Sequence, residues 1–226
     1  MKVTFLKLSL LALLTMALPA NAQKKTIHVV PEGAKIFVDG NEVGNSSYTV
    51  KFNRNIDFFL LKFEYPGYIT RNVKLMKSNP NRTVSYTLME DEAMASSVGG
   101  ETDGVDVANK WFDVTCRKGL TEDVVWKRLM NIAVTNFENV EVRDKAAGWI
   151  KTGWRTTTFT SQVVRTRMEV RLSFSEDDVP SYRVRITSEI KDRDCIGNQC
   201  FIKYNRVLKQ YESVIQELQT TVGSNL

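Results

Sequence analysis

Short β-branched and aromatic runs, separated by turn-forming residues, dominate the chain from residue 26 to residue 89. Within them Val84, Tyr86 and Leu88 alternate with polar neighbours, and this period of two is typical of a half-buried strand. Gly, Pro, Asn and Asp fill the gaps between the runs. The pattern predicts an all-β domain, and several short strands at this spacing favour a β-sandwich. The predicted strands are 26–30, 35–39, 47–52, 57–65, 68–76 and 82–89.

The first 22 residues predict an export signal. Lys2 and Lys7 accompany an apolar run from Leu8 to Leu18, and Ala20-Asn21-Ala22 has the small-x-small pattern that signal peptidase accepts. The run is shorter than the about 20 apolar residues that a bilayer span requires. We therefore expect a signal peptide at 1–22, a mature chain without a transmembrane span, and a location in the periplasm or at the cell surface.

Size and charge narrow the class of protein further. Two of the 31 Lys and Arg residues lie in the signal, so the remaining 29 exceed the 26 Asp and Glu residues by three. Such a small excess is not the charge of a nucleic-acid-binding protein, and no nucleic acid partner is expected. The 204 residues that follow the signal, of 226 in all, are enough for two domains.

The N-terminal region resembles a known module, the PEGA domain. The signature tetrapeptide is present as Pro31-Glu32-Gly33-Ala34, and Val38-Asp39-Gly40, Gly44 and Tyr65-Pro66-Gly67-Tyr68 follow in the family's order. The resemblance covers about residues 26–90. It implies a β-sandwich that serves as a small non-catalytic binding module on exported proteins at cell surfaces.

A change of composition predicts the domain boundaries. Residues 23–90 form the PEGA-like domain, and the acidic, Gly/Ser-rich segment 91–104 is typical of a linker. Residues 105–226 predict an α+β domain with an antiparallel sheet packed on two helices, so the fold class is multidomain. Its predicted elements are a helix that Thr121 caps and that runs to Phe137, strands at 139–144, 149–159, 163–175 and 181–191, and a long helix from Tyr204 to Val222.

The order of elements in the second domain carries a further resemblance. With Trp126 in the first helix and Gly148-Trp149-Ile150-Lys151-Thr152-Gly153-Trp154 after it, the domain is similar to the helix-grip domains of BamC-type outer-membrane assembly lipoproteins. The similarity implies a fold and not a role, because the chain lacks the lipobox cysteine of those lipoproteins.

Three cysteines stand in the chain: Cys116, Cys195 and Cys200. Export implies an oxidising compartment, in which disulfides persist. The simplest pairing joins Cys195 to Cys200 and leaves Cys116 free, and the alternative pairs Cys116 with one of the other two. A zinc site is disfavoured because His28 is the only histidine, so neither a metal nor a cofactor is expected.

The residue inventory also argues against an enzyme. Nucleophilic sites of the Ser-His or Cys-His type need an imidazole base, and His28 lies in the first predicted strand. The carboxylate pair Asp177-Asp178 falls in a predicted turn between two strands. A polar hairpin tip explains that pair better than glycosidase chemistry, which needs two carboxyls across a cleft.

The candidate binding residues lie on two long predicted strands. If 163–175 and 181–191 pair as a hairpin, five arginines share one face with Glu169 and Glu189. Guanidinium groups suit carboxylates and phosphates, so the partner would be an acidic envelope protein, an anionic glycan or lipid headgroups. The alternative is a solvated face with cross-strand charge pairs. The candidates are Arg165, Arg167, Arg171, Arg183 and Arg185.

Two tryptophans are a second candidate, as a carbohydrate platform. Trp149 and Trp154 are five residues apart, so in one continuous strand they point to opposite faces. Core packing is then expected for Trp154, and Trp149 joins the candidate binding residues.

Together these features predict an exported, non-enzymatic bacterial cell-envelope protein that acts in binding or scaffolding. The alternatives are an envelope-assembly factor that works through protein partners and a carboxylate-based glycan hydrolase. A hydrolase would require a concave pocket with convergent polar groups.

Overall fold

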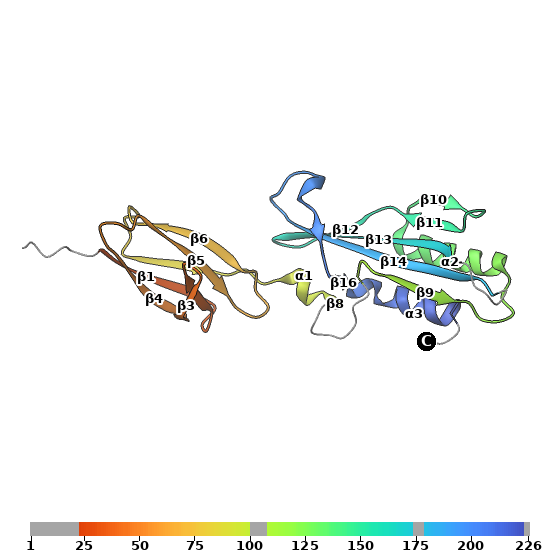
Figure 1. The fold of residues 1–226 in the computed structure, drawn as a ribbon, viewed down its shortest axis with the longest axis horizontal. Coiled ribbons are helices and arrows are strands. Elements are labelled where there is room, and N and C mark those ends of the chain that lie inside the picture. The colour runs from red at the N-terminus through yellow and green to blue at the C-terminus, as the bar shows by residue number, and fades with distance from the viewer. Residues whose placement is uncertain (1–22, 100–107, 174–178, 224–226) are drawn as a thin grey trace, which may run out of the picture. The chain divides into compact units, whose positions relative to one another are not determined.

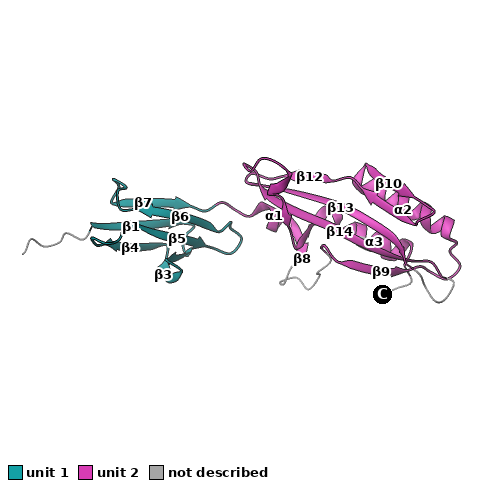
Figure 2. Cartoon of the chain, turned by 45° about the horizontal axis from the view of Figure 1, so that its top comes forward, with its two compact units in different colours: residues 1–88 teal, residues 89–226 magenta. Residues whose placement is uncertain are grey.

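The computed structural model describes residues 23–99, 108–173 and 179–223. The chain divides into two compact units, Met1–Leu88 and Met89–Leu226, which Figure 2 colours separately. The described part is β-rich with few helices. The predicted signal peptide at 1–22 lies outside the described residues.

Unit 1 contains seven strands in two sheets. One sheet has the order β4-β1-β7, in which β1 and β7 are parallel, and the other has the antiparallel order β3-β2-β5-β6. Both sheets contribute to one buried cluster, with Ile27 from the first sheet and Ile36, Leu61 and Phe63 from the second. The strands are β1 (Gln23–Val30), β2 (Lys35–Val38), β3 (Asn41–Asn45), β4 (Ser47–Phe52), β5 (Phe58–Glu64), β6 (Arg71–Met76) and β7 (Thr83–Thr87).

The Pro31-Glu32-Gly33-Ala34 segment forms the turn between β1 and β2. The amide of Ala34 donates to the carbonyl of Pro31 at 3.2 Å, and that of Gly33 donates to Oγ of Ser46 at 2.7 Å. Gly33 has φ +88°, and a Cβ there would stand 3.3 Å from the ring of Tyr65. The left-handed backbone therefore favours glycine here, and the ring of Tyr65 leaves little room for a Cβ.

Unit 2 is built on a seven-stranded antiparallel sheet. The order is β10-β11-β13-β14-β15, with β12 also paired to β13 and β9 also paired to β14. The long pair β13–β14 runs through its centre, as Figure 1 shows. The strands are β9 (Trp111–Thr115), β10 (Val140–Asp144), β11 (Trp149–Thr152), β12 (Arg155–Thr158), β13 (Gln162–Ser173), β14 (Ser181–Asp192) and β15 (Ile202–Lys203).

Two helices, α2 (Glu122–Phe137) and α3 (Glu212–Thr221), pack on one face of this sheet. Leu129 and Leu218 from the helices share a buried cluster with Val164, Met168 and Val184 from β13 and β14. The predicted start of the first helix is confirmed, because Oγ1 of Thr121 accepts the Val124 amide at 3.4 Å. The sheet presents its other face away from the helices.

The predicted linker at 91–104 differs from the structure. Residues 92–99 form α1 (Glu92–Ala95) and β8 (Ser97–Gly99) within unit 2, and β8 pairs with β16 (Arg206–Leu208). Nε of Arg206 also donates to Oγ of Ser97 at 2.8 Å. The small polar residues are ordered by these partners far along the chain, which composition does not reveal. Residues 100–104 lie outside the described part.

The predicted long C-terminal helix is wrong in its first half. Residues 202–208 form β15 and β16, a 3-10 helix follows at Lys209–Tyr211, and α3 begins only at Glu212. The amide of Tyr204 donates to the Ser188 carbonyl at 2.9 Å, so this segment bonds to the sheet. Tyr204, Val207 and Leu208 have helical spacing, but the pairing of β16 with β8 overrides this local preference.

Besides β8, β15 and β16, two further strands differ from the predictions. Asn41–Asn45 forms β3, although its residues are mostly polar or glycine, because β2 pairs with four of its five residues around a bulge at Val43. Trp111–Thr115 forms β9 at the side of β14. The predicted strand 149–159 is divided into β11 and β12 at Gly153 and Trp154.

Candidate functional site

The sheet face opposite the helices carries all five candidate arginines. In the β13–β14 register Arg165 stands opposite Glu189, Arg167 opposite Thr187, and Glu169 opposite Arg185. The expected hairpin therefore forms in the register that gathers these side chains. We call this surface the arginine face; its members are Arg165, Arg167, Arg171, Arg183 and Arg185, the carboxylates Asp113, Glu169 and Glu189, and the indoles of Trp111, Trp149 and Trp154.

Glu169 is the central carboxylate of the arginine face. Its side chain is 4 % exposed, and it accepts from Arg171 at 2.7 Å and from Arg185 at 2.7 Å. Burial raises the pKa of this carboxyl, but the hydrogen bonds from the two guanidinium groups outweigh burial and hold the pKa below its ordinary value. Glu169 is thus an ionised, almost fully enclosed anion shared by two cations.

Two further ion pairs compensate the outer arginines. Nη2 of Arg165 lies 2.6 Å from Glu189, and its Nη1 donates to Oδ1 of Asn198 at 3.0 Å. Arg183 lies 3.4 Å from Asp113 on the neighbouring strand β9. The expected alternative of cross-strand charge pairs therefore describes three of the five arginines, and Arg171 pairs with Glu169 of its own strand.

Arg167 is different from the other four. It forms no ion pair with any residue in the described ranges, and its Nε is buried without an acceptor. Its guanidinium lies 4.2 Å from the centroid of the Trp154 ring. Oγ1 of Thr187, directly across the strand pair, is also buried and without a hydrogen-bond partner. The Arg167 position therefore combines a stacked cation with an unused hydroxyl.

Tryptophan rings cover the guanidinium groups of the arginine face. Trp154 also lies 4.3 Å from Arg165, and Trp111 lies 4.5 Å from Arg185. Trp149 lies 5.3 Å from Arg171. Such contacts restrict the guanidinium groups, and those of Arg165, Arg171 and Arg185 already donate to carboxylates of the same face.

The expectation that Trp154 packs in the core is wrong. The chain leaves β11 after Thr152 and enters β12 at Arg155, so Trp149 and Trp154 do not belong to one continuous strand. The break allows both rings to reach the arginine face. Trp111 and Asp113 were missed altogether, although Trp111, Asp113 and Thr115 alternate with Phe112, Val114 and Cys116, which is a strand-like signal.

The arginine face keeps a positive surplus. Its five arginines stand against three carboxylates, which leaves two positive charges. One surplus charge belongs to Arg167, and the other arises because Arg171 and Arg185 share Glu169.

The cysteines adopt the simpler of the two expected pairings. Cys195 and Cys200 form a disulfide, and Cys116 is free and buried. Burial raises the pKa of the Cys116 thiol to about 11, so this thiol stays protonated and unreactive at neutral pH. The loop that the disulfide closes supplies Asn198, and Phe201 just beyond it lies 3.9 Å from Arg165.

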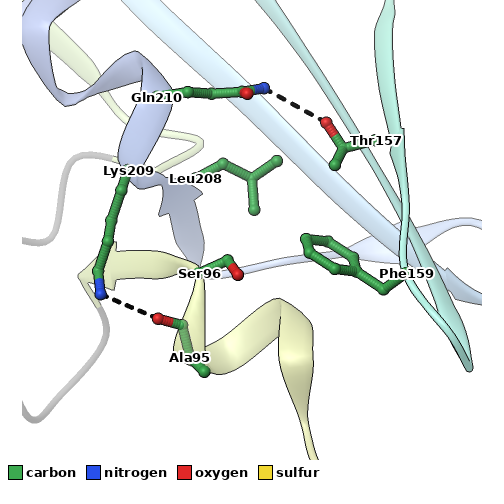
Figure 3. Close-up of a pocket in the computed structure, with 7 residues that line it drawn as sticks. All are labelled: Ala95, Ser96, Thr157, Phe159, Leu208, Lys209 and Gln210. Atoms are coloured by element: carbon green, nitrogen blue, oxygen red, sulfur yellow. Dashed lines mark hydrogen bonds between the residues drawn. The ribbon is translucent and has the colours of Figure 1, made fainter.

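Unit 2 also contains a hollow of about 410 Å³ beside α1, β12 and the 3-10 helix Lys209–Tyr211, drawn in Figure 3. Lys209 donates to the carbonyl of Ala95 at 2.9 Å, and Gln210 donates to Oγ1 of Thr157 at 3.3 Å. These polar side chains at the hollow are therefore engaged with the protein itself.

The remaining sequence candidates add no site. His28 lies exposed on β1, and Asp177-Asp178 falls outside the described residues. Over residues 23–99, 108–173 and 179–223, no three His, Cys, Asp or Glu side chains gather as a metal site would require. No helix in these ranges has both the length and the apolar character needed to cross a bilayer.

Comparison with protein-family models finds no match to this chain, and comparison with curated proteins also finds none.

Proposed function

We propose that this chain is an exported, non-enzymatic protein of the cell envelope that binds an anionic partner through the arginine face. The observation that carries the proposal is Arg167, a guanidinium without a carboxylate partner in the described chain, stacked on Trp154 beside the unused hydroxyl of Thr187. Export rests on the signal pattern at residues 1–22.

In this proposal the two units have different folds, and unit 2 carries the arginine face. Unit 1 is a PEGA-type β-sandwich, which the signature turn at Gly33 and the core shared by its two sheets support. Unit 2 is a helix-grip-like α+β domain whose helices cover one sheet face and leave the arginine face for a partner.

The partner class follows from charge and geometry. A guanidinium held 4.2 Å from an indole centroid has lost rotamer freedom before binding, so less entropy is lost when an oxyanion arrives. The surplus of two positive charges favours a carboxylate- or phosphate-bearing partner over a neutral one. The ion pairs around Glu169 and Glu189 hold the neighbouring arginines in place and leave Arg167 as the contact point.

The test compares two charge reversals of equal size. Arg167→Glu removes the contact point, whereas Lys118→Glu changes an exposed residue in the turn after β9. Binding of the purified mature chain is measured by retention on immobilised polygalacturonate, polyglutamate and uncharged dextran. We expect Arg167→Glu to weaken binding about tenfold, which corresponds to ~1.4 kcal/mol, and Lys118→Glu to have little effect.

The outcome also separates the two partner classes. Preference for polygalacturonate indicates an anionic glycan, and preference for polyglutamate indicates an acidic protein, as an envelope-assembly factor would show. Equal retention of the native chain on dextran and on both polyanions contradicts the proposal, and so does equal weakening by the two reversals.

A further inference from the structure

The outer face of the β5–β6 hairpin in unit 1 carries large apolar side chains in solvent. Phe58 is 41 % exposed, Leu60 55 % and Met76 41 %. They are three of the four large hydrophobic side chains that the described part of unit 1 exposes, the fourth being Val30. We call Phe58, Leu60 and Met76 the hairpin patch.

The register shows that the hairpin patch is continuous. Phe58 stands opposite Met76, and Leu60 stands one pleat further along β5, opposite Lys74. The inward residues of the same strand, Leu61 and Phe63, already supply the core. The core therefore gives no reason for apolar side chains on both sides of β5, and an apolar group exposed in this way is typical of a docking surface.

Cations flank the hairpin patch. Nζ of Lys74 lies 3.9 Å from the centroid of the Phe58 ring, and Nζ of Lys62 lies 4.1 Å from that of Phe37. Lys62 also pairs with Glu64 at 2.8 Å, whereas Lys74 has no ion pair with any residue that the structure describes. Both lysines and Asn72 surround Leu60 in a hollow of about 490 Å³.

Unit 1 as a whole is also positively charged, like the surroundings of the hairpin patch. Residues 23–88 contain ten Lys and Arg against five Asp and Glu, a net charge of +5, whereas residues 89–226 contain 19 against 21. The basic excess of the mature chain thus belongs entirely to the unit that carries the hairpin patch.

From these observations we propose that the hairpin patch docks on an anionic phospholipid surface. Phe58, Leu60 and Met76 enter the boundary between headgroups and acyl chains, and Lys74 and Lys62 meet the lipid phosphates. Apolar side chains inserted beside lysines are the two contributions that together hold a peripheral protein on a bilayer. The inference concerns unit 1 alone and does not depend on the arginine face.

The experiment measures co-sedimentation of the purified mature chain with phosphatidylglycerol vesicles and with phosphatidylcholine vesicles. We expect partition onto the phosphatidylglycerol vesicles only, weakened by raised salt. Lys74→Glu is expected to lower that partition more than about tenfold, because it changes the local charge by two. Leu60→Ser is expected to lower it about tenfold at unchanged charge.

Lys51→Glu is the matched control, because Lys51 lies exposed on β4 of the other sheet and the substitution changes the net charge equally. Equal loss with Lys51→Glu and Lys74→Glu would mean attraction by net charge and would overturn the proposal. Absence of binding to both kinds of vesicle would overturn it as well. So would a purely ionic attachment, which would appear as full binding by Leu60→Ser together with release of the bound chain by polyglutamate at equal charge concentration. Arg167→Glu is expected to bind the vesicles normally, so failure here leaves the arginine face untouched.

Discussion

The arginine face of unit 2 and the hairpin patch of unit 1 are both outer faces of antiparallel sheets, but they use their side chains in opposite ways. On the arginine face nearly every charged side chain has a partner of opposite charge, and the almost fully buried Glu169 pairs with both Arg171 and Arg185. On the hairpin patch the large side chains are half-exposed and Lys74 has no carboxylate partner among the described residues. The paired charges of the arginine face contribute to the stability of unit 2 and leave Arg167 as its contact point, whereas the hairpin patch offers several side chains without such partners.

Among changes to the two surfaces, the largest expected effect on stability comes from removing the central anion of the arginine face. Glu169→Gln leaves the guanidinium groups of Arg171 and Arg185 without their shared charge, and we expect unit 2 to lose about 1.5–3 kcal/mol of stability. Urea denaturation measures the loss. Glu141→Gln is the control, because Glu141 is 42 % exposed and lies 3.7 Å from Lys151, so it should cost under about 1 kcal/mol. Equal losses would show that burial of Glu169 adds nothing.

The pH dependence of stability sharpens the same comparison. The guanidinium partners hold the pKa of Glu169 below its ordinary value, so in acid the unfolded chain takes up the proton first. The contribution of Glu169 is complete above the unfolded pKa of about 4.3 and is lost as the pH falls through the lower folded value. Melting temperatures between pH 7 and pH 3 should therefore fall less for Glu169→Gln than for the native chain. Parallel curves would contradict the assignment.

A smaller effect is expected from the indole that stacks on two arginines. Trp154→Leu removes the ring that lies 4.3 Å from Arg165 and 4.2 Å from Arg167, and the cost should be about 0.5–2 kcal/mol. Trp154→Phe keeps an aromatic face and should recover part of the loss, as measured by thermal unfolding. If phenylalanine recovers no more than leucine, the stacking contributes only by covering surface.

Sequence patterns predict the two central strands of the arginine face, but they do not predict all of the residues that belong to it. The alternation in β13 and β14 is long and regular, so the sequence alone predicts that the five arginines share one face. Trp111 and Asp113 were missed because β9 is short and is held by its pairing with β14. The position of Trp154 depends on a break in the strand at Gly153, which a count of alternating residues does not register.

The hairpin patch illustrates a different limit of sequence patterns. In β5 the run Phe58-Phe59-Leu60-Leu61 is apolar at every position, so alternation cannot tell the inward side chains from the outward ones. Only the pairing with β2 and β6 assigns Leu61 to the core and Leu60 to the surface. The C-terminal segment failed for a different reason: Tyr204, Val207 and Leu208 fall at helical spacing, but pairing with β8 and with Ser188 holds this segment in strands.

The smallest expected change in stability belongs to the hairpin patch, where neighbouring leucines provide a matched pair. Leu60 is 55 % exposed and Leu61 is 2 % exposed. Leu60→Ser should leave the free energy of unfolding of unit 1 within about 0.5 kcal/mol of the native value, because the site has no buried contact to lose. Leu61→Ser should lower the free energy of unfolding by about 2–5 kcal/mol, since it opens a cavity in the core and buries a hydroxyl. Both are measured by urea denaturation of the mature chain. A large loss from Leu60→Ser would mean that the outer face of β5 is covered within the protein itself, and the patch would then not be a surface for a membrane or any other partner.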